Sequence, residues 1–165
     1  NLEMLKIAIK YKPDFVCIVP EKRKEITTEG GLNLKKNLKI LKFIIKTLNK
    51  NKIRTSLFIN PHKKDVKISK LLNSKCIELH TGKISNLIKK KNKYKSEFEK
   101  IKSCSKYAKS LGLEIHAGHG MDYKTSKILS KIKEIEEFNI GHFIIGESII
   151  YGLKKTINKF LKILK

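Results

Sequence analysis

Short apolar runs alternate along the chain with longer segments of helical periodicity. Five of these runs end at proline, glycine or polar residues, which is typical of buried strands. The predicted strands span residues 15–19, 56–59, 76–79, 113–117 and 141–145. Because strands that alternate with helices build a parallel sheet, the pattern predicts an α/β fold made of β/α units.

Apolar stripes at spacings of three and four residues predict helices between the strands. The clearest stripes span residues 34–48, 98–111 and 153–164, and lysines face outward on the first and last of them. Gly112 follows the second stripe, where a helix commonly ends in a left-handed residue. Periodicity alone does not separate an open doubly wound sheet from a closed barrel.

The composition is that of an ordinary globular protein, with 40% hydrophobic residues in 165. No apolar run approaches the ~20 residues that cross a bilayer, so we expect no membrane partner. Residues 1–12 lack the pattern of a secretion signal. Cys17, Cys76 and Cys104 are far apart and form no zinc or redox motif. These features predict a soluble, cytoplasmic protein.

A formal net charge of +23, from 38 basic and 15 acidic residues, is also typical of nucleic-acid-binding proteins. All the basic residues except Arg23 and Arg54 are lysines, whereas base edges and bidentate phosphate contacts favour arginine. A coding bias toward AT-rich codons produces the same lysine-rich surface. We therefore expect no nucleic-acid partner, and a basic nucleic-acid-binding protein stays as the alternative.

Polar residues near strand ends are the first candidates for chemistry, because reactive groups of a β/α barrel project from the carboxyl ends of its strands. Glu3 lies at the end of what would be a further strand, residues 1–4. Glu78 lies inside an apolar run, where lost hydration tends to raise the pKa of a carboxylate. His119 follows a strand in a glycine-bearing loop, where an imidazole exchanges protons near neutral pH.

Each candidate has a simpler structural explanation. A lone glutamate such as Glu3 is more often solvated or salt-bridged than catalytic, whereas the apolar neighbours of Glu78 make the two explanations equal for it. His116 and His119 have the spacing of a metal pair, but no further ligand follows at a recognisable distance. We therefore expect no metal site.

Two glycine-bearing regions suit phosphate groups. Many barrels hold phosphate in the loops after the last two strands, through backbone N–H groups and a helix N-terminus. The stretch Gly118–Gly120 and the turn at Gly146 lie in those predicted loops. The polar loop of residues 20–31 offers hydroxyls, cations and glycines to a phosphorylated ligand as well.

Six sequence blocks carry a resemblance to a known family. The blocks are Asn1-Leu2-Glu3-Met4, Pro20-Glu21-Lys22-Arg23 through Gly30-Gly31-Leu32, Ser56-Leu57-Phe58-Ile59, Ile77-Glu78-Leu79-His80-Thr81-Gly82, Ala117-Gly118-His119-Gly120 and Asn139-Ile140-Gly141-His142. Their order and spacing resemble those of the pyridoxine 5′-phosphate synthase family, over essentially the whole chain. The block that begins at Pro20 is the most specific of the six.

The resemblance implies a (β/α)8 TIM barrel and a reaction of vitamin B6 biosynthesis. The implied enzyme condenses 3-amino-2-oxopropyl phosphate with 1-deoxy-D-xylulose 5-phosphate to pyridoxine 5′-phosphate, phosphate and water. The implied partners are these small phosphorylated substrates and further copies of the chain, since the complete enzyme is implied to be an octamer. No metal or organic cofactor is implied.

The resemblance also implies roles for single residues. Glu3 matches the family's carboxylate proton acceptor, Glu78 its transition-state stabiliser and His119 its proton donor. The matched substrate contacts are Thr27, for the pentulose phosphate, and Gly120, Gly141 and His142, for the aminoketone phosphate. Two phosphates on the substrates would explain the two separate glycine-bearing regions.

The family's first two strands have no counterpart in this sequence. Those strands carry a second histidine proton acceptor and arginines for the substrate phosphates. We therefore expect residues 1–165 to form a single partial TIM-barrel domain of about six units, inactive or weakly folded by itself because two sheet edges are exposed. The resemblance assigns no role to His116 or Glu147.

Overall fold

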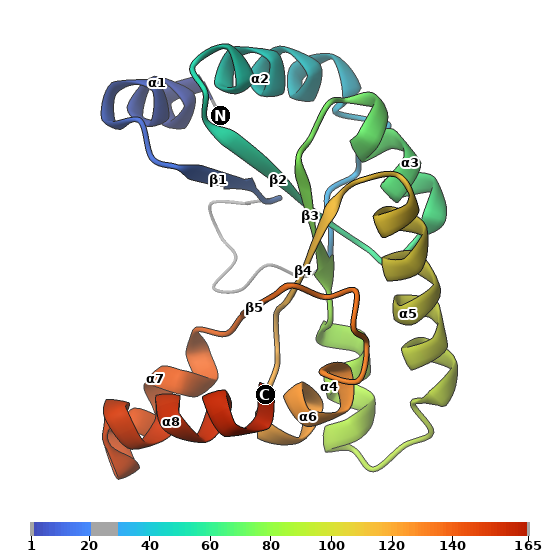
Figure 1. Ribbon diagram of the computed structural model, residues 1–165, viewed down its shortest axis with the longest axis vertical. Helices are drawn as coiled ribbons and strands as arrows, with labels where there is room; N and C mark the ends of the chain where they lie inside the picture. Colours follow the sequence, from blue (N-terminus) through green and yellow to red (C-terminus); the bar gives the residue numbers. More distant parts are fainter. Residues whose placement is uncertain (1, 21–29, 165) are drawn as a thin grey trace.

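The computed structural model describes residues 2–20 and 30–164 (Figure 1). One sheet contains β1 (Phe15–Ile18), β2 (Arg54–Ile59), β3 (Cys76–His80), β4 (Glu114–Gly118) and β5 (Glu137–Asn139). The strands lie side by side in the order of the sequence, and each neighbouring pair is parallel. A doubly wound sheet would reverse this order at a switch point, whereas a barrel does not. The curled sheet is therefore part of a singly wound α/β barrel.

Helices follow the strands and flank the sheet. They are α1 (Leu2–Tyr11), α2 (Leu38–Lys50), α3 (Lys63–Leu71), α4 (Gly82–Lys89), α5 (Lys95–Ser110), α6 (Tyr123–Leu129), α7 (His142–Tyr151) and α8 (Leu153–Leu164). The helices α2 and α3 contact β2, and α5 contacts β4, along the outer side of the curl (Figure 1). The helices α7 and α8 pack against each other at the end of the molecule opposite α1 (Figure 1).

The outer face of the sheet forms the apolar core. Leu57, Ile77 and Ile115, from three neighbouring strands, are fully buried. They belong to one cluster with Ile45 of α2 and Ile101 of α5, which the predicted helical stripes also contain. Burial of this apolar surface between helices and sheet is the main force that holds the curl together.

The inner face of the same strands is polar. Successive side chains of a strand point to opposite faces, so the residues that alternate with the core positions point inward. In β3 and β4 these inward positions hold Glu78, His80, Glu114 and His116. The inner face of β3 and β4 therefore carries four neighbouring titratable side chains, those of Glu78, His80, Glu114 and His116.

Four predicted strands and the three predicted helices are confirmed, with small shifts at their ends. Gly112 has the left-handed φ of +68° that we expect after a helix. The stripe of α8 is confirmed only in part, because Leu153 and Leu161 are exposed while Phe160 is buried.

Two strand predictions are wrong. Residues 141–145 belong to α7, and the last strand is β5, which ends before them. Residues 2–4 open α1 instead of ending a strand, because Leu5 and Ala8 form a helical stripe that packs against α2. Short apolar runs of this kind have no periodicity that separates a strand from a helix.

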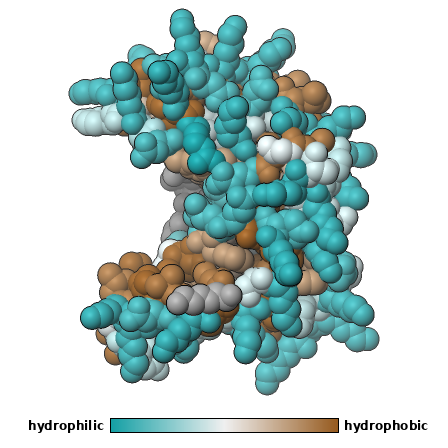
Figure 2. All heavy atoms as spheres, in the orientation of Figure 1, coloured by the Kyte–Doolittle hydropathy of each residue, from teal (hydrophilic) through white to brown (hydrophobic). Residues whose placement is uncertain are grey.

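Two surface features complete the fold. Exposed apolar side chains of α7 and α8 gather at one end of the molecule, visible as brown spheres in Figure 2. They include Ile145, Ile149, Ile150, Tyr151 and Leu153. Among the described residues, no helix has the length and apolar character needed to span a membrane.

Candidate active site

Glu78 is the buried carboxylate of the inner face. Its Oε2 atom accepts a hydrogen bond of 2.9 Å from the Asn139 amide and lies 3.5 Å from the Cys17 sulfur. Burial raises the pKa of Glu78, while the hydrogen bonds from Cys17 and Asn139 and the charge of His116 oppose that rise. The structure therefore supplies donors for a carboxylate that would otherwise lose its hydration.

Gly118 makes room for this carboxylate. A Cβ atom on Gly118 would lie 2.1 Å from Glu78 Oε1 and 3.2 Å from the Asn139 Cβ. No side chain other than hydrogen fits there without displacing one of the two partners. Gly118 thus leaves the space that the Glu78 side chain occupies, in addition to shaping the loop.

His119 and His80 form a ring pair at the carboxyl ends of β3 and β4. The ring centroids are 4.8 Å apart, and Phe58 contacts both rings edge-on. A Cβ on Gly82 would lie 2.8 Å from His80 Nε2 and 2.9 Å from His119 Cδ2. Burial, and then the charge of His119, lowers the pKa of His80 to about 4. His80 is therefore neutral near pH 7.

The backbone at His119 is held in an uncommon conformation. Its φ of +82° lies in the left-handed region, which a residue with a side chain seldom adopts. The Thr81 hydroxyl lies 2.7 Å from the carbonyl oxygens of both Gly118 and His119, and the Thr81 N–H donates to Gly118 as well. These contacts fix the loop and offset its strain, a feature that is common at functional sites.

A cavity of about 460 Å³ joins four of the predicted site residues. His119 and Gly120, after β4, line it together with Gly141 and His142, after β5. Gly141 is the N-cap of α7 and makes no side-chain cap hydrogen bond, so backbone N–H groups of the first turn are available there. Lys89 also lines the cavity. A helix N-terminus, glycine backbone and a lysine favour an anion such as phosphate.

Asn139 connects this cavity to Glu78. The Asn139 side chain lines the cavity and donates its hydrogen bond to the carboxylate of Glu78. The structure thus brings together five of the seven predicted site residues: Glu78, His119, Gly120, Gly141 and His142. The wrong strand prediction for residues 141–145 put Gly141 and His142 at the amino end of a strand, whereas they follow the carboxyl end of β5, which ends at Asn139.

Glu3 is not brought to this cavity. Glu3 is exposed in the first turn of α1, at the end of the molecule opposite α7 (Figure 1). Thr27 lies outside the described residues. A carboxylate in the first turn of a helix stabilises that helix through its macrodipole.

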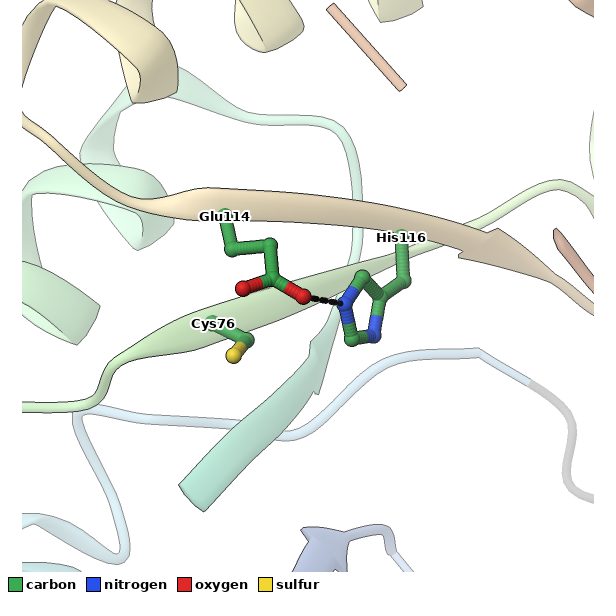
Figure 3. A group of neighbouring side chains, drawn as sticks. All are labelled: Cys76, Glu114 and His116. Carbon is green, nitrogen blue, oxygen red and sulfur yellow. Dashed lines mark hydrogen bonds and ion pairs between the residues drawn. The ribbon is translucent and has the colours of Figure 1, made fainter. Parts of the chain in front are cut away.

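Cys76, Glu114 and His116 form a second polar cluster on the inner face (Figure 3). Glu114 Oε1 is 2.9 Å from His116 Nε2, and the three candidate ligand atoms lie within 4.8 Å of one another. The Arg54 guanidinium donates to Glu114 and lies 3.3 Å from the Cys76 sulfur. The hydrogen bond with His116, assisted by Arg54, lowers the pKa of Glu114.

The Arg54 guanidinium therefore balances the negative charge of Glu114 in this cluster. Arg54 contacts both Glu114 and Cys76, and His116 Nδ1 lies 3.5 Å from a second carboxylate, Glu137. We assign the cluster a structural role across β2, β3, β4 and β5. His116, which motif reasoning left without a role, belongs to it.

Sequence reasoning missed Asn139 and His80 as site residues. Both stood inside recognised blocks, yet neither residue type in isolation signals chemistry. The usable signal was the strand register: Gly118 pairs with both His80 and Asn139, so the three positions share one level of the sheet.

Comparisons with known proteins identify the family of this chain. The family model for pyridoxal phosphate biosynthesis protein PdxJ matches residues 1–165. A pyridoxine 5′-phosphate synthase of Pelagibacter ubique is 66% identical over 163 residues, which cover 99% of this chain and 68% of that protein. The synthase of Zymomonas mobilis is 45% identical over 95% of this chain and 60% of its own length. The chain thus spans about two thirds of these relatives.

A solved structure shares the fold. The crystal structure of citrate synthase SbnG matches 99% of this chain and 69% of its own, with a TM-score of 0.57 and 9% identity. At that identity the likeness concerns the fold alone. On the family match and the sequence identities, the chain belongs to the pyridoxal phosphate biosynthesis protein PdxJ family.

Proposed function

We propose that this protein carries out the pyridoxine 5′-phosphate synthase reaction, in which 3-amino-2-oxopropyl phosphate and 1-deoxy-D-xylulose 5-phosphate condense. The observation that carries the proposal is the cavity lined by His119, Gly120, Gly141 and His142, with Glu78 joined to it through Asn139. The family match and the names of the relatives support the same reaction.

The site has the groups that such a condensation uses. Imine formation, dehydration and ring closure all move protons, and one positioned acid or base contributes about 10²- to 10⁴-fold to such steps. In our proposal His119 donates protons, since its neighbour His80 stays neutral near pH 7. The Glu78 carboxylate stabilises developing positive charge. The proposed chemistry needs no metal or organic cofactor.

The phosphate of the aminoketone substrate is assigned to the α7 end of the cavity. Backbone N–H groups at Gly141 and His142 and the ammonium of Lys89 supply donors and positive charge there. Gly120 has a φ of +72°, which lets its backbone approach a ligand without a Cβ in the way. Thr27 is proposed to contact the other phosphate, and Glu3 to accept a proton.

The remaining expectations concern the protein as a whole and stay proposals. We propose that residues 1–165 belong to a single barrel domain and that the protein works in the cytoplasm. A homo-oligomer is proposed because the exposed apolar surface of α7 and α8 is typical of an interface. No nucleic-acid partner is proposed, and none of the comparisons supports one.

Substrate binding and turnover test the proposal separately. The chain is titrated with each phosphorylated substrate by calorimetry, and inorganic phosphate serves as the competitor. For turnover, the chain is joined to the part of the Pelagibacter ubique relative that this chain does not match. The expected result is aminoketone phosphate binding by the chain and a product with pyridoxine-ring absorbance from the hybrid.

Two controls make the result decisive. Replacement of Lys89 by Ala should weaken binding of the aminoketone phosphate because its ammonium is lost, whereas replacement of the exposed His62 should not. A well-folded hybrid that binds neither substrate would contradict the proposal. A hybrid that binds both substrates but forms no pyridoxine ring would refute the reaction while leaving the phosphate sites in place.

A further inference from the structure

Glu78 and Asn139 come from strands that are not neighbours. Glu78 lies in β3 and Asn139 ends β5, with β4 between them. Their side chains nevertheless form a hydrogen bond of 2.9 Å, from Asn139 Nδ2 to Glu78 Oε2. A contact that crosses an intervening strand requires a residue without a side chain on that strand.

Gly118 of β4 is that residue. It pairs in register with Asn139, and a Cβ in its place would enter the space of both partners. The three residues therefore form one arrangement on three adjacent strands. Burial of the Glu78 side chain and the absence of a Gly118 side chain are both needed for it.

We infer that Asn139 is a positioning residue for Glu78, which fixes the direction of its carboxylate and favours its ionised form. The role of Glu78 on the substrate rests on the proposed function, whereas the contact itself does not. An ionised carboxylate only accepts hydrogen bonds, and the amide of asparagine supplies an N–H donor to it without adding charge.

Asn139 and Cys17 both donate to Glu78, and Asn139 is the closer of the two. Cys17 also faces Glu78 Oε2, but at 3.5 Å, and a thiol is a weak donor. Its thiol pKa is raised to about 12, through lost hydration and then the charge of Glu78, so it stays protonated as a neutral second donor. His116 acts only through its charge and Glu137 opposes it. Among these groups, the amide makes the shortest contact.

The position of Asn139 connects this role to the cavity. It is the last residue of β5 and lies one residue before Ile140, with Gly141 and the α7 N-terminus next along the chain. The backbone that forms the proposed phosphate site therefore also carries the donor to Glu78. A ligand that orders residues 139–142 would order the carboxylate at the same time.

The test is the titration of Glu78 itself in the unmodified chain and in variants. Carbon-13 labelled glutamate carboxyls are followed by NMR between pH 3 and 9, and Glu78→Gln identifies the Glu78 signal by its loss. Asn139→Asp keeps the volume and removes the donor, whereas Asn139→Ala removes the whole amide. Asn158→Ala, at an exposed position on α8, is the matched control.

We expect the Glu78 pKa to rise by roughly one to two units in Asn139→Ala, because a hydrogen bond to an ionised group is lost. The rise should be larger in Asn139→Asp, in which two carboxyl groups share one proton. Asn158→Ala should leave the titration unchanged. An unchanged Glu78 pKa in a folded Asn139→Ala or Asn139→Asp chain would overturn the inference.

The outcome is independent of turnover. If the Glu78 titration moves as expected while no synthase product forms in the hybrid, the proposed function fails and the positioning role stands. If product forms and the titration does not move, the positioning role fails alone. Cys17→Ala should shift the Glu78 pKa less than either Asn139 variant, and an equal or larger shift would assign the role to Cys17 instead.

Discussion

The rings of His80 and His119 lie 4.8 Å apart, and Gly82 leaves the space that both of them need. Two imidazolium ions at this separation repel each other, so the second ring of the pair takes up its proton only at a lower pH. Burial, and then the charge of His119, lowers the His80 pKa to about 4. His80 is therefore neutral near pH 7, beside the histidine that lines the cavity.

Replacement of His119 by Asn should lower turnover of the hybrid enzyme by about 10²- to 10⁴-fold, because a proton donor is lost. KM should change much less, since the phosphate contacts remain. Steady-state rates from the absorbance of the pyridoxine ring measure both quantities. Unchanged turnover in His119→Asn would remove this residue from the mechanism, and His62→Asn is the control.

Stability should fall as the pH drops from about 6.5 toward 4, and His80 should cause part of that fall. The folded protein holds His80 with a lowered pKa, so the unfolded chain binds this proton first as the pH falls. The contribution of His80 is therefore complete above pH 6.5 and lost below pH 4. Urea unfolding of His80→Gln across this range should show a flatter pH dependence. Parallel curves for the two proteins would contradict the assignment.

Gly118→Ala should destabilise the fold by about 1–3 kcal/mol, because the new methyl group overlaps the Glu78 carboxylate. Gly146→Ala is the matched control, since a Cβ there meets no atom within 4 Å. That change lies inside α7 and should stabilise by about 0.5–1 kcal/mol. Urea midpoints measure both. Equal effects of the two substitutions would show that Gly118 has no packing role.

Replacement of Arg54 by Gln should create zinc affinity at Cys76, Glu114 and His116. The change removes the cation that now compensates the cluster and leaves three ligand types that Zn²⁺ prefers. Calorimetry with zinc alone should show binding roughly tenfold or more tighter than in the unmodified chain. The gain should vanish in Arg54→Gln/Cys76→Ser. Equally tight binding by the unmodified chain would mean that Arg54 does not exclude the metal.

Nucleic-acid binding should be weak in specificity and strongly dependent on salt. A net charge of +23 attracts any polyanion, and that attraction falls as counterions compete. Fluorescence anisotropy with RNA and DNA oligonucleotides of several sequences should give similar affinities that decline steeply between 50 and 200 mM salt. A preference for one sequence that persists at high salt would instead favour the nucleic-acid alternative.

The sequence by itself determined which segments become strands and helices where their side-chain periodicity is strong. The apolar run around Ile77 predicts a strand and the apolar stripe around Ile45 predicts a helix, each from local periodicity. Gly112 marks a helix end through its backbone freedom. The ordered motif blocks also determined the family, and with it Glu78 and His119 as candidates. Periodicity was insufficient at residues 2–4 and 141–145, where short apolar runs suit either kind of element.

Only the tertiary structure decided which of these residues meet. Strand order and register decide which inward side chains lie beside one another across the sheet, and local periodicity predicts neither of them. The contact of Asn139 with Glu78 depends on a glycine in the strand between them, and the neutrality of His80 depends on what packs around it. Long-range strand pairing creates both the burial and the contacts of these side chains. Their hydrogen bonds and shifted pKa values therefore arise only in the folded sheet.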